Sequence, residues 1–233
     1  MNDSFGNAMS LKGKNVMSAV DGNKFRRLSE QFKQDLTESD KKRNEGEGLL
    51  FPLTSLINND HSLSLEIRNN YINIYYRGGN LLKLSEVKEQ TYKPFFEKKY
   101  ADEKDTFLKR LPSEITSSED LECWLEKFPK LKSVMDSWFL KHPKLEREFQ
   151  QMVVWENNNS SIAKSTDYFI ADIEYVIGDA RFDMVAIQWD SDPYARKLQS
   201  YSPKLCFIEM KYGDAALNGN AGMLKHVEHW KNC

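Results

Sequence analysis

Residues 204–213, with the sequence KLCFIEMKYG, decide the fold of this chain. The apolar run from Leu205 to Ile208 is typical of a buried strand, and Glu209 and Lys211 follow it. Side chains alternate across a strand, so this acid and this amine share a face. Burying either charge without a partner would cost several kcal/mol. The two groups therefore pair with each other and their neighbours, or they hold a ligand.

Two further strands are expected upstream of this one. The segments TDYFIADIEYVIG (residues 166–178) and ARFDMVAIQW (residues 180–189) are rich in β-branched and aromatic residues, as strands are. Gly178 and Asp179 suit a tight turn between them. Asp183 stands among apolar residues of the second strand, where a lone carboxylate is unusual. If the second and third strands pair antiparallel, Asp183 can lie beside Glu209.

Two carboxylates at that separation repel each other unless a cation lies between them. Oxygen ligands with open water positions are what Mg²⁺ prefers. Such a cation could lower the pKa of a bound water and neutralise charge on a phosphate oxygen. Lys211 could orient or deprotonate the attacking water, or stabilise the transition state. The alternative is a salt-bridged cluster at a sheet edge. Asp172 and Glu174 share a face of the first strand and are second-choice ligands, since a solvated face explains them as well.

The set formed by Asp183 and the tripeptide Glu209-Met210-Lys211 resembles the PD-(D/E)xK nuclease superfamily, which has the restriction-endonuclease-like fold. The resemblance covers about residues 143–233. It implies an α/β fold with a mixed central sheet flanked by helices. It also implies that Asp183 and Glu209 bind Mg²⁺ or Mn²⁺, that the Met210 carbonyl is an extra ligand, and that Lys211 is catalytic.

Many members of that superfamily carry a further glutamate on the helix before the strands. Here the candidates are Glu148 and Glu146, with a slight preference for Glu148. The helix after the third strand often carries a polar residue near the site, and Lys225 and His226 are the candidates for contacting nucleic acid. His226 and His229 lack an HExxH pattern, so a surface or DNA-facing helix is favoured over a metal site.

The remainder, residues 1–142, is expected to pack on this core as an N-terminal antiparallel hairpin and helical extension. Its expected parts are a helix at residues 23–36, an exposed linker at about residues 35–48, antiparallel hairpins at residues 62–84 and helices at residues 85–142. Arg68 and Arg77 lie near the hairpin turns and are candidate phosphate contacts. An extension of the main sheet or a dimer surface is the favoured interpretation of this hairpin region.

The function implied by the resemblance is a metal-dependent nuclease that hydrolyses phosphodiester bonds, with DNA as the expected substrate. The alternatives are an inactive nucleic-acid-binding or protein-assembly module on the same fold, and a regulatory protein that works through the hairpins. The formal charge of −2 excludes a globally basic protein but not a local basic cleft.

Composition bears on the compartment and the partners. Three well-separated cysteines suit a reducing compartment. The N-terminus lacks an apolar signal core, and no apolar run approaches the ~20 residues of a membrane span. We therefore expect a cytoplasmic protein without a membrane partner, and a homodimer is compatible with the sequence.

Overall fold

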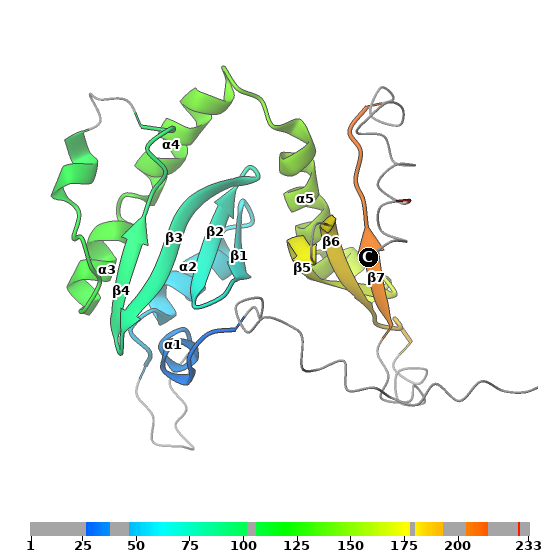
Figure 1. Ribbon diagram of the computed structural model, residues 1–233, viewed down its shortest axis with the longest axis horizontal. Coiled ribbons are helices and arrows are strands. Elements are labelled where there is room, and N and C mark those ends of the chain that lie inside the picture. The colour runs from blue at the N-terminus through cyan, green and yellow to red at the C-terminus, as the bar shows by residue number, and fades with distance from the viewer. Residues whose placement is uncertain are drawn as a thin grey trace, which may run out of the picture.

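The computed structural model describes residues 27–37, 47–101, 106–177, 180–192 and 204–213, together with Glu228. These residues form a mixed α/β structure with two antiparallel sheets (Figure 1). The α-helices are α1 (Glu30–Asp35), α2 (Phe51–Asn59), α3 (Ser118–Leu125), α4 (Phe128–Phe139) and α5 (Leu145–Asn159), and the 3-10 helices are η3 (Thr106–Arg110) and η4 (Ser161–Lys164). The strands are β1 (Leu63–Ile67), β2 (Tyr71–Tyr76), β3 (Gly79–Lys88), β4 (Thr91–Phe95), β5 (Tyr168–Ile177), β6 (Ala180–Gln188) and β7 (Leu205–Ile208).

The first sheet has the strand order β1-β2-β3-β4. Asn70 has a φ of 59° at the turn between β1 and β2, as expected from the Asn-Asn pair. The Gly78-Gly79 pair favours the next turn at these two residues, but the residues with positive φ are Arg77 (49°) and Gly78 (70°). Gly79 already pairs with Tyr76 as the first residue of β3. The turn therefore lies one residue earlier than the sequence suggested.

The N-terminal sheet is larger than the expected hairpin. Residues 85–95 were expected to be helical, but β3 continues to Lys88 and β4 pairs with it. In β4 the buried residues Tyr92 and Pro94 alternate with the exposed residues Lys93 and Phe95, which is the period of a strand rather than of a helix. Helix α2 was not expected, although a proline in its first turn is a helix-start signal. Helices α3 and α4 lie within the region expected to be helical.

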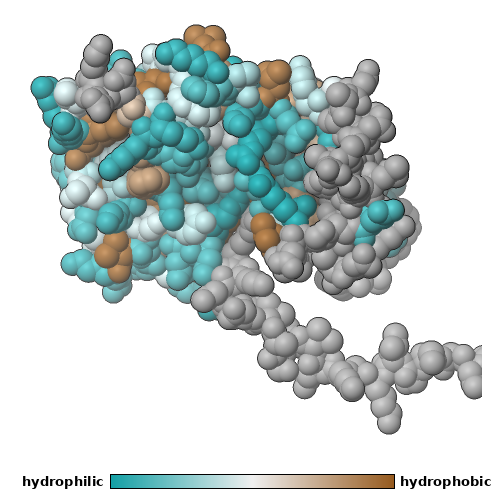
Figure 2. All heavy atoms as spheres, turned by 45° about the horizontal axis from the view of Figure 1, so that its top comes forward, coloured by the Kyte–Doolittle hydropathy of each residue, from teal (hydrophilic) through white to brown (hydrophobic). Residues whose placement is uncertain are grey.

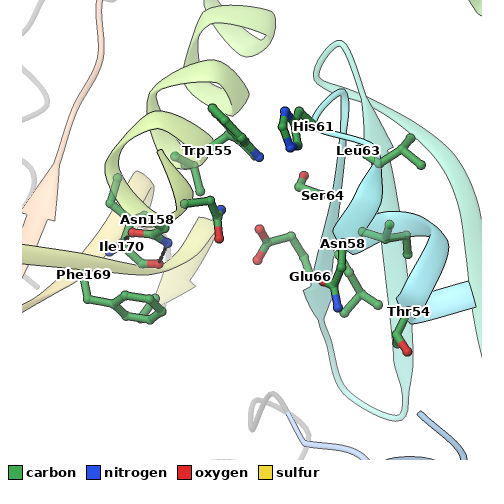
Figure 3. A pocket seen from close by; sticks show the side chains of 15 residues that line it. Thr54, Asn58, His61, Leu63, Ser64, Glu66, Trp155, Asn158, Phe169 and Ile170 are labelled. Atoms are coloured by element: carbon green, nitrogen blue, oxygen red, sulfur yellow. Dashed lines mark hydrogen bonds between the residues drawn. The ribbon is translucent and has the colours of Figure 1, made fainter. Parts of the chain in front are cut away.

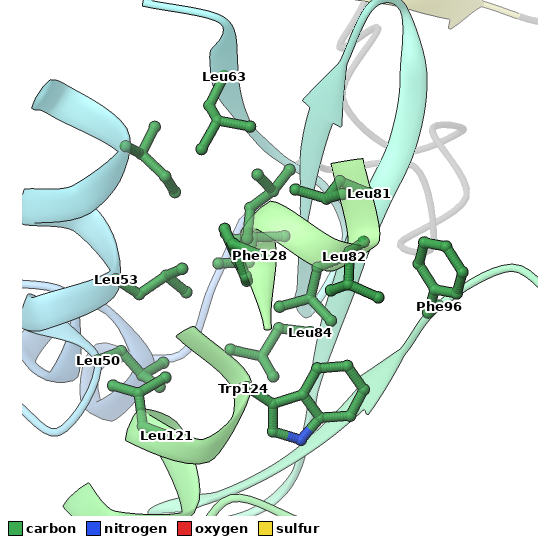
Figure 4. Close-up of a cluster of buried hydrophobic side chains, with 14 of the residues drawn as sticks. Leu50, Leu53, Leu63, Leu81, Leu82, Leu84, Phe96, Leu121, Trp124 and Phe128 are labelled. Atoms are coloured by element: carbon green, nitrogen blue, oxygen red, sulfur yellow. The ribbon is translucent and has the colours of Figure 1, made fainter. Parts of the chain in front are cut away.

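The larger hydrophobic core lies in this N-terminal region. Figure 4 shows leucines of α2 and β3 meeting aromatic side chains of α3 and α4, and most of these side chains are almost fully buried. Burial of each such side chain stabilises the fold by roughly 1.5–3 kcal/mol. The labelled members of this cluster are Leu50, Leu53, Leu63, Leu81, Leu82, Leu84, Phe96, Leu121, Trp124 and Phe128.

The two ends of the expected linker belong to this core region. Asp35 is 3% exposed and accepts hydrogen bonds from the Tyr92 hydroxyl and the Gln31 amide. Gly48 lies so close to α1 that a Cβ atom would come within 2.4 Å of the Gln34 carbonyl oxygen. Residues 38–46 lie outside the described residues. The expectation of an exposed segment is therefore wrong at Asp35, whose carboxylate is buried.

The second sheet has the strand order β5-β6-β7, and the three strands lie where the sequence predicted them. Both pairings are antiparallel, whereas the resemblance implied a mixed sheet. Helix α5 packs against this sheet through Val154, in a second core with Ile170, Ile173 and Met184. The expected turn at residues 178–179 lies outside the described residues, as does the expected last helix except for Glu228, which is helical.

The face of the molecule that comes forward in Figure 2 is the top of Figure 1. Hydrophilic residues cover most of it, and hydrophobic residues are isolated there. The connection from α4 to α5 lies at the top of Figure 1, where the chain passes from the first sheet to the second. None of the described helices combines the length and the apolar character needed to cross a bilayer.

Candidate active site

The pairing of β6 with β7 brings Asp183 to Glu209. Met184 pairs with Ile208 in the antiparallel register, so the next residues outward are Asp183 and Glu209. The Asp183 carboxylate accepts a hydrogen bond of 2.9 Å from the backbone N–H of Met210. This contact places Asp183 at the end of β7, where the chain carries Glu209 and Lys211. The convergence expected from strand alternation is therefore present.

Glu209 and Lys211 form a buried ion pair. The Lys211 ammonium donates a hydrogen bond to the Glu209 carboxylate, and the side chains are only 9% and 5% exposed, respectively. Burial alone would lower the pKa of Lys211. The hydrogen bond to Glu209 and the charges of Glu209, Glu146 and Asp183 outweigh burial, so the pKa of Lys211 is raised. In this arrangement Lys211 acts as a fixed positive charge.

Three carboxylates thus surround one ammonium group. Glu209, Glu146 and Asp183 all raise the pKa of Lys211 through their charge, and the formal charges of three carboxylates and one ammonium group sum to −2. Within the described ranges, no group of three or more histidine, cysteine, aspartate or glutamate side chains lies close enough together to hold a metal ion. Glu146 therefore stands near the cluster without completing a cage.

Helix α5 presents Glu146 to the site and turns Glu148 away from it. Glu148 accepts hydrogen bonds of 2.8 and 3.2 Å from Arg77, which also donates to Asp136 of α4 at 2.8 Å. The hydrogen bonds to Glu148 and Asp136 raise the pKa of Arg77. The slight preference for Glu148 is corrected in favour of Glu146, because Glu148 is occupied by Arg77. Arg77 itself joins α4 to α5, so its guanidinium is not directed at a phosphate.

Substitution of these two glutamates should separate their roles. Glu146→Gln is expected to weaken Mn²⁺ uptake by the site, because it removes one of the three carboxylates. Glu148→Gln is expected to leave Mn²⁺ uptake unchanged and to lower the free energy of unfolding by about 1 kcal/mol or less, since its ion pair is partly exposed. Calorimetric titration and urea unfolding measure the two effects. Weaker Mn²⁺ uptake in Glu148→Gln, with uptake unchanged in Glu146→Gln, would instead assign Glu148 to the site.

Two adjacent glutamines of α5 connect the site to both sheets, and both were missed from the sequence. The Gln150 side chain donates to the Asp183 backbone carbonyl. The Gln151 side chain donates to the Ser62 and Tyr75 carbonyls and accepts from the Gly78 N–H at 2.8 Å. The sequence signal that could have found them is a pair of glutamines next to the apolar positions of a helix, because buried amides need hydrogen-bond partners.

The apolar residues of α5 are only partly buried. Leu145, Phe149 and Met152 are 47%, 47% and 56% exposed, while Gln150 and Gln151 are buried. Asp183 of β6 and Tyr75 of β2 present backbone carbonyls to the helix, and Gly78 presents an N–H. Glutamine satisfies those groups where an apolar side chain would not.

Arg68 connects the sheets instead of facing solvent. It is 7% exposed and donates to the Asp172 carboxylate at 3.0 Å and to the Ile173 carbonyl at 3.2 Å. Its guanidinium is therefore not placed to contact a phosphate, and Asp172 is occupied as its ion-pair partner. Glu174 contacts Arg181 at 2.6 Å and Arg147 at 3.2 Å. These pairings account for both second-choice ligands. Lys225, His226 and His229 lie outside the described residues.

A cavity of about 700 Å³ lies between α2 and β1 on one side and α5 and β5 on the other. Figure 3 shows His61 facing Trp155 across it and Glu66 pointing into it from β1. The two rings are 4.3 Å apart at their centroids, and Glu66 lies 3.8 Å from Arg68. Trp155 follows Glu146 by nine helical residues, about 13 Å along the axis. The cavity is therefore separate from the carboxylate cluster.

Comparison with known proteins finds no matching family model, no similar curated protein and no similar solved structure. A proposal of function consequently rests on the side chains gathered where β7 ends beside Asp183 of β6.

Proposed function

We propose that this chain is a metal-dependent nuclease that hydrolyses phosphodiester bonds in nucleic acid, with DNA as the expected substrate. The observation that carries the proposal is that the Asp183 carboxylate accepts a hydrogen bond from the Met210 N–H, between Glu209 and Lys211, whose side chains form an ion pair. The order along the chain of α5 followed by the strands β5, β6 and β7 supports a restriction-endonuclease-like arrangement.

The residues present suit a hard divalent cation. Asp183 uses Oδ2 for the Met210 N–H, which leaves Oδ1 as a donor to a metal. Carboxylate and carbonyl oxygens are preferred ligands of Mg²⁺, and the cluster's formal charge favours a 2+ ion. Asp183, Glu209 and the Met210 carbonyl would hold Mg²⁺ or Mn²⁺, with Glu146 nearby. A bound cation of this kind lowers the pKa of a water and neutralises charge on a phosphate oxygen.

The protein groups position and stabilise the reacting phosphate. Lys211, held by Glu209, can donate to a non-bridging phosphate oxygen, where negative charge develops in the transition state. It can also orient the attacking water. The Met210 N–H fixes the Asp183 carboxylate and Gln150 fixes the Asp183 backbone, so the carboxylate is positioned before substrate binds.

Metal removal tests this proposal on the unaltered protein. Labelled single-stranded and duplex DNA and RNA should be cleaved with Mg²⁺ or Mn²⁺ and left intact with EDTA. Calorimetry should detect Mn²⁺ uptake. Absence of both uptake and cleavage on every substrate would exclude the proposal.

A binding or assembly module is the second candidate. The observation that favours it is the Glu209–Lys211 ion pair, in which both charges are already matched without a metal. Binding of nucleic acid without Mn²⁺ uptake and without cleavage would identify this function.

A further inference from the structure

A second cavity, of about 550 Å³, lies between α4 and the residues that follow β4. It lies away from the carboxylate cluster and includes none of the cluster's residues. Among its described lining residues the charged side chains are the lysines Lys99, Lys130 and Lys141, and His142 adds a further basic group. A concave surface with one sign of charge attracts ligands of the opposite charge. The ligand expected from charge alone is an anion.

Lys130, Ser133 and Ser137 are spaced by three and four residues along α4, so they lie in one row. Lys141 follows Ser137 by four residues, in the turn after Phe139, the last residue of α4. With Lys141 the row is about 16 Å long, which exceeds a single phosphate. Lys130 and Lys141 are exposed and have no ion-pair partner among the described residues, whereas Lys99 is paired with Glu97. Two uncompensated charges thus mark the ends of the row.

Aromatic rings lie at one end of the row. The exposed ring of His142 stacks on Trp138 with centroids 4.4 Å apart and an interplanar angle of 21°. Trp138 in turn contacts Tyr100 edge-to-face at 5.1 Å. Trp138 supports one face of His142, and the imidazole can take another planar ring on its outer face. Histidine rings are among those on which unpaired bases stack.

We propose that this cavity binds an unpaired strand of nucleic acid, with phosphates at Lys130 and Lys141 and a base stacked on His142. Naming the ligand as nucleic acid rests on the proposed function. An unpaired strand fits better than a duplex, because duplex bases are already stacked within the helix. His142 precedes Glu146 by four residues, a span of at most about 14 Å. A strand that passes His142 can therefore reach the carboxylate cluster.

Binding of fluorescein-labelled dT12, measured by anisotropy in EDTA, tests the proposal without cleavage. Lys130→Ala/Lys141→Ala should reduce the slope of log K against log [salt] by about 1.4, since each phosphate contact on a single strand contributes about 0.7. His142→Ala should weaken binding about 5- to 150-fold, the range for losing one base–aromatic stack. A dT12·dA12 duplex should bind more weakly than dT12.

Lys88→Ala/Lys93→Ala is the matched control, because it removes two exposed lysines at the β3–β4 end of the first sheet. It should leave the salt slope unchanged. An unchanged slope in Lys130→Ala/Lys141→Ala, or equal effects of the two double variants, would overturn the inference. Metal-dependent cleavage that survives such a result would leave the proposed function standing. Binding through this cavity by a protein that never cleaves would support the inference and exclude the nuclease.

Discussion

Asp183→Asn is expected to abolish Mn²⁺ uptake and to lower metal-dependent cleavage by about 10³-fold or more. Loss of a single preorganised electrostatic partner costs about 10²–10³ in rate, and this variant is expected to lose the metal as well. Asp183 is the one acid of the cluster that contacts the β7 end through Met210. Calorimetric titration with Mn²⁺ and a cleavage time course measure the two effects.

The substitution should leave the fold intact. The asparagine side-chain oxygen can still accept the hydrogen bond from the Met210 N–H, so the junction between β6 and β7 keeps its contact. Lys211 is a poorer target, because its removal would leave Glu209 buried without its partner, which destabilises a fold by about 3–5 kcal/mol.

Glu156→Gln is the matched control for Asp183→Asn. Glu156 is exposed and follows Glu146 by ten residues on α5, about 15 Å along the axis. It should bind Mn²⁺ and cleave as the unaltered protein does. Full Mn²⁺ uptake by Asp183→Asn would show that Asp183 does not bind the metal. It would therefore contradict the nuclease proposal, in which Asp183 is a metal ligand.

The sequence predicts the part of the candidate site that strand geometry determines. Alternation places Glu209 and Lys211 on one face, and antiparallel pairing then brings Asp183 to them. Strand geometry could not decide between Glu146 and Glu148. The choice depends on Arg77, 71 residues before Glu148, whose guanidinium occupies one of the two glutamates. Helical periodicity describes only the neighbours within one helix.

The same limit explains the errors in the fold. Residues 85–95 were included in the helical region that follows them, whereas pairing with the preceding strand makes β4 from residues 91–95. On α5, apolar residues alone would place the buried face at Leu145, Phe149 and Met152. The buried residues are instead Gln150 and Gln151, because carbonyl and N–H groups from both sheets meet the helix there. Tertiary partners overrode local pattern in both places.

Arg68→Met is expected to lower the free energy of unfolding by about 3–5 kcal/mol, the cost of breaking a buried ion pair by removing one of its two partners. Position alone, beside a hairpin turn, suggested a phosphate contact. In the structure the Arg68 side chain is instead only 9% exposed, and it forms an ion pair with the Asp172 side chain, which is 16% exposed. It also donates to the carbonyls of Ile67 and Ile173, which belong to different sheets. Urea unfolding measures the change.

Arg181→Met is the control, because Arg181 makes an ion pair of similar length with Glu174 but its side chain is 48% exposed. Exposed pairs contribute about 0–1 kcal/mol, so this variant should unfold almost as the unaltered protein does. In Arg68→Met/Asp172→Asn part of the lost stability should return, since the side chain that lost Arg68 then carries no charge. If Arg68→Met cost less than about 1 kcal/mol while binding of dT12 fell, Arg68 would be a nucleic-acid contact after all. The two sheets would then be held together by Gln151, Arg77 and the apolar contacts of α5 instead.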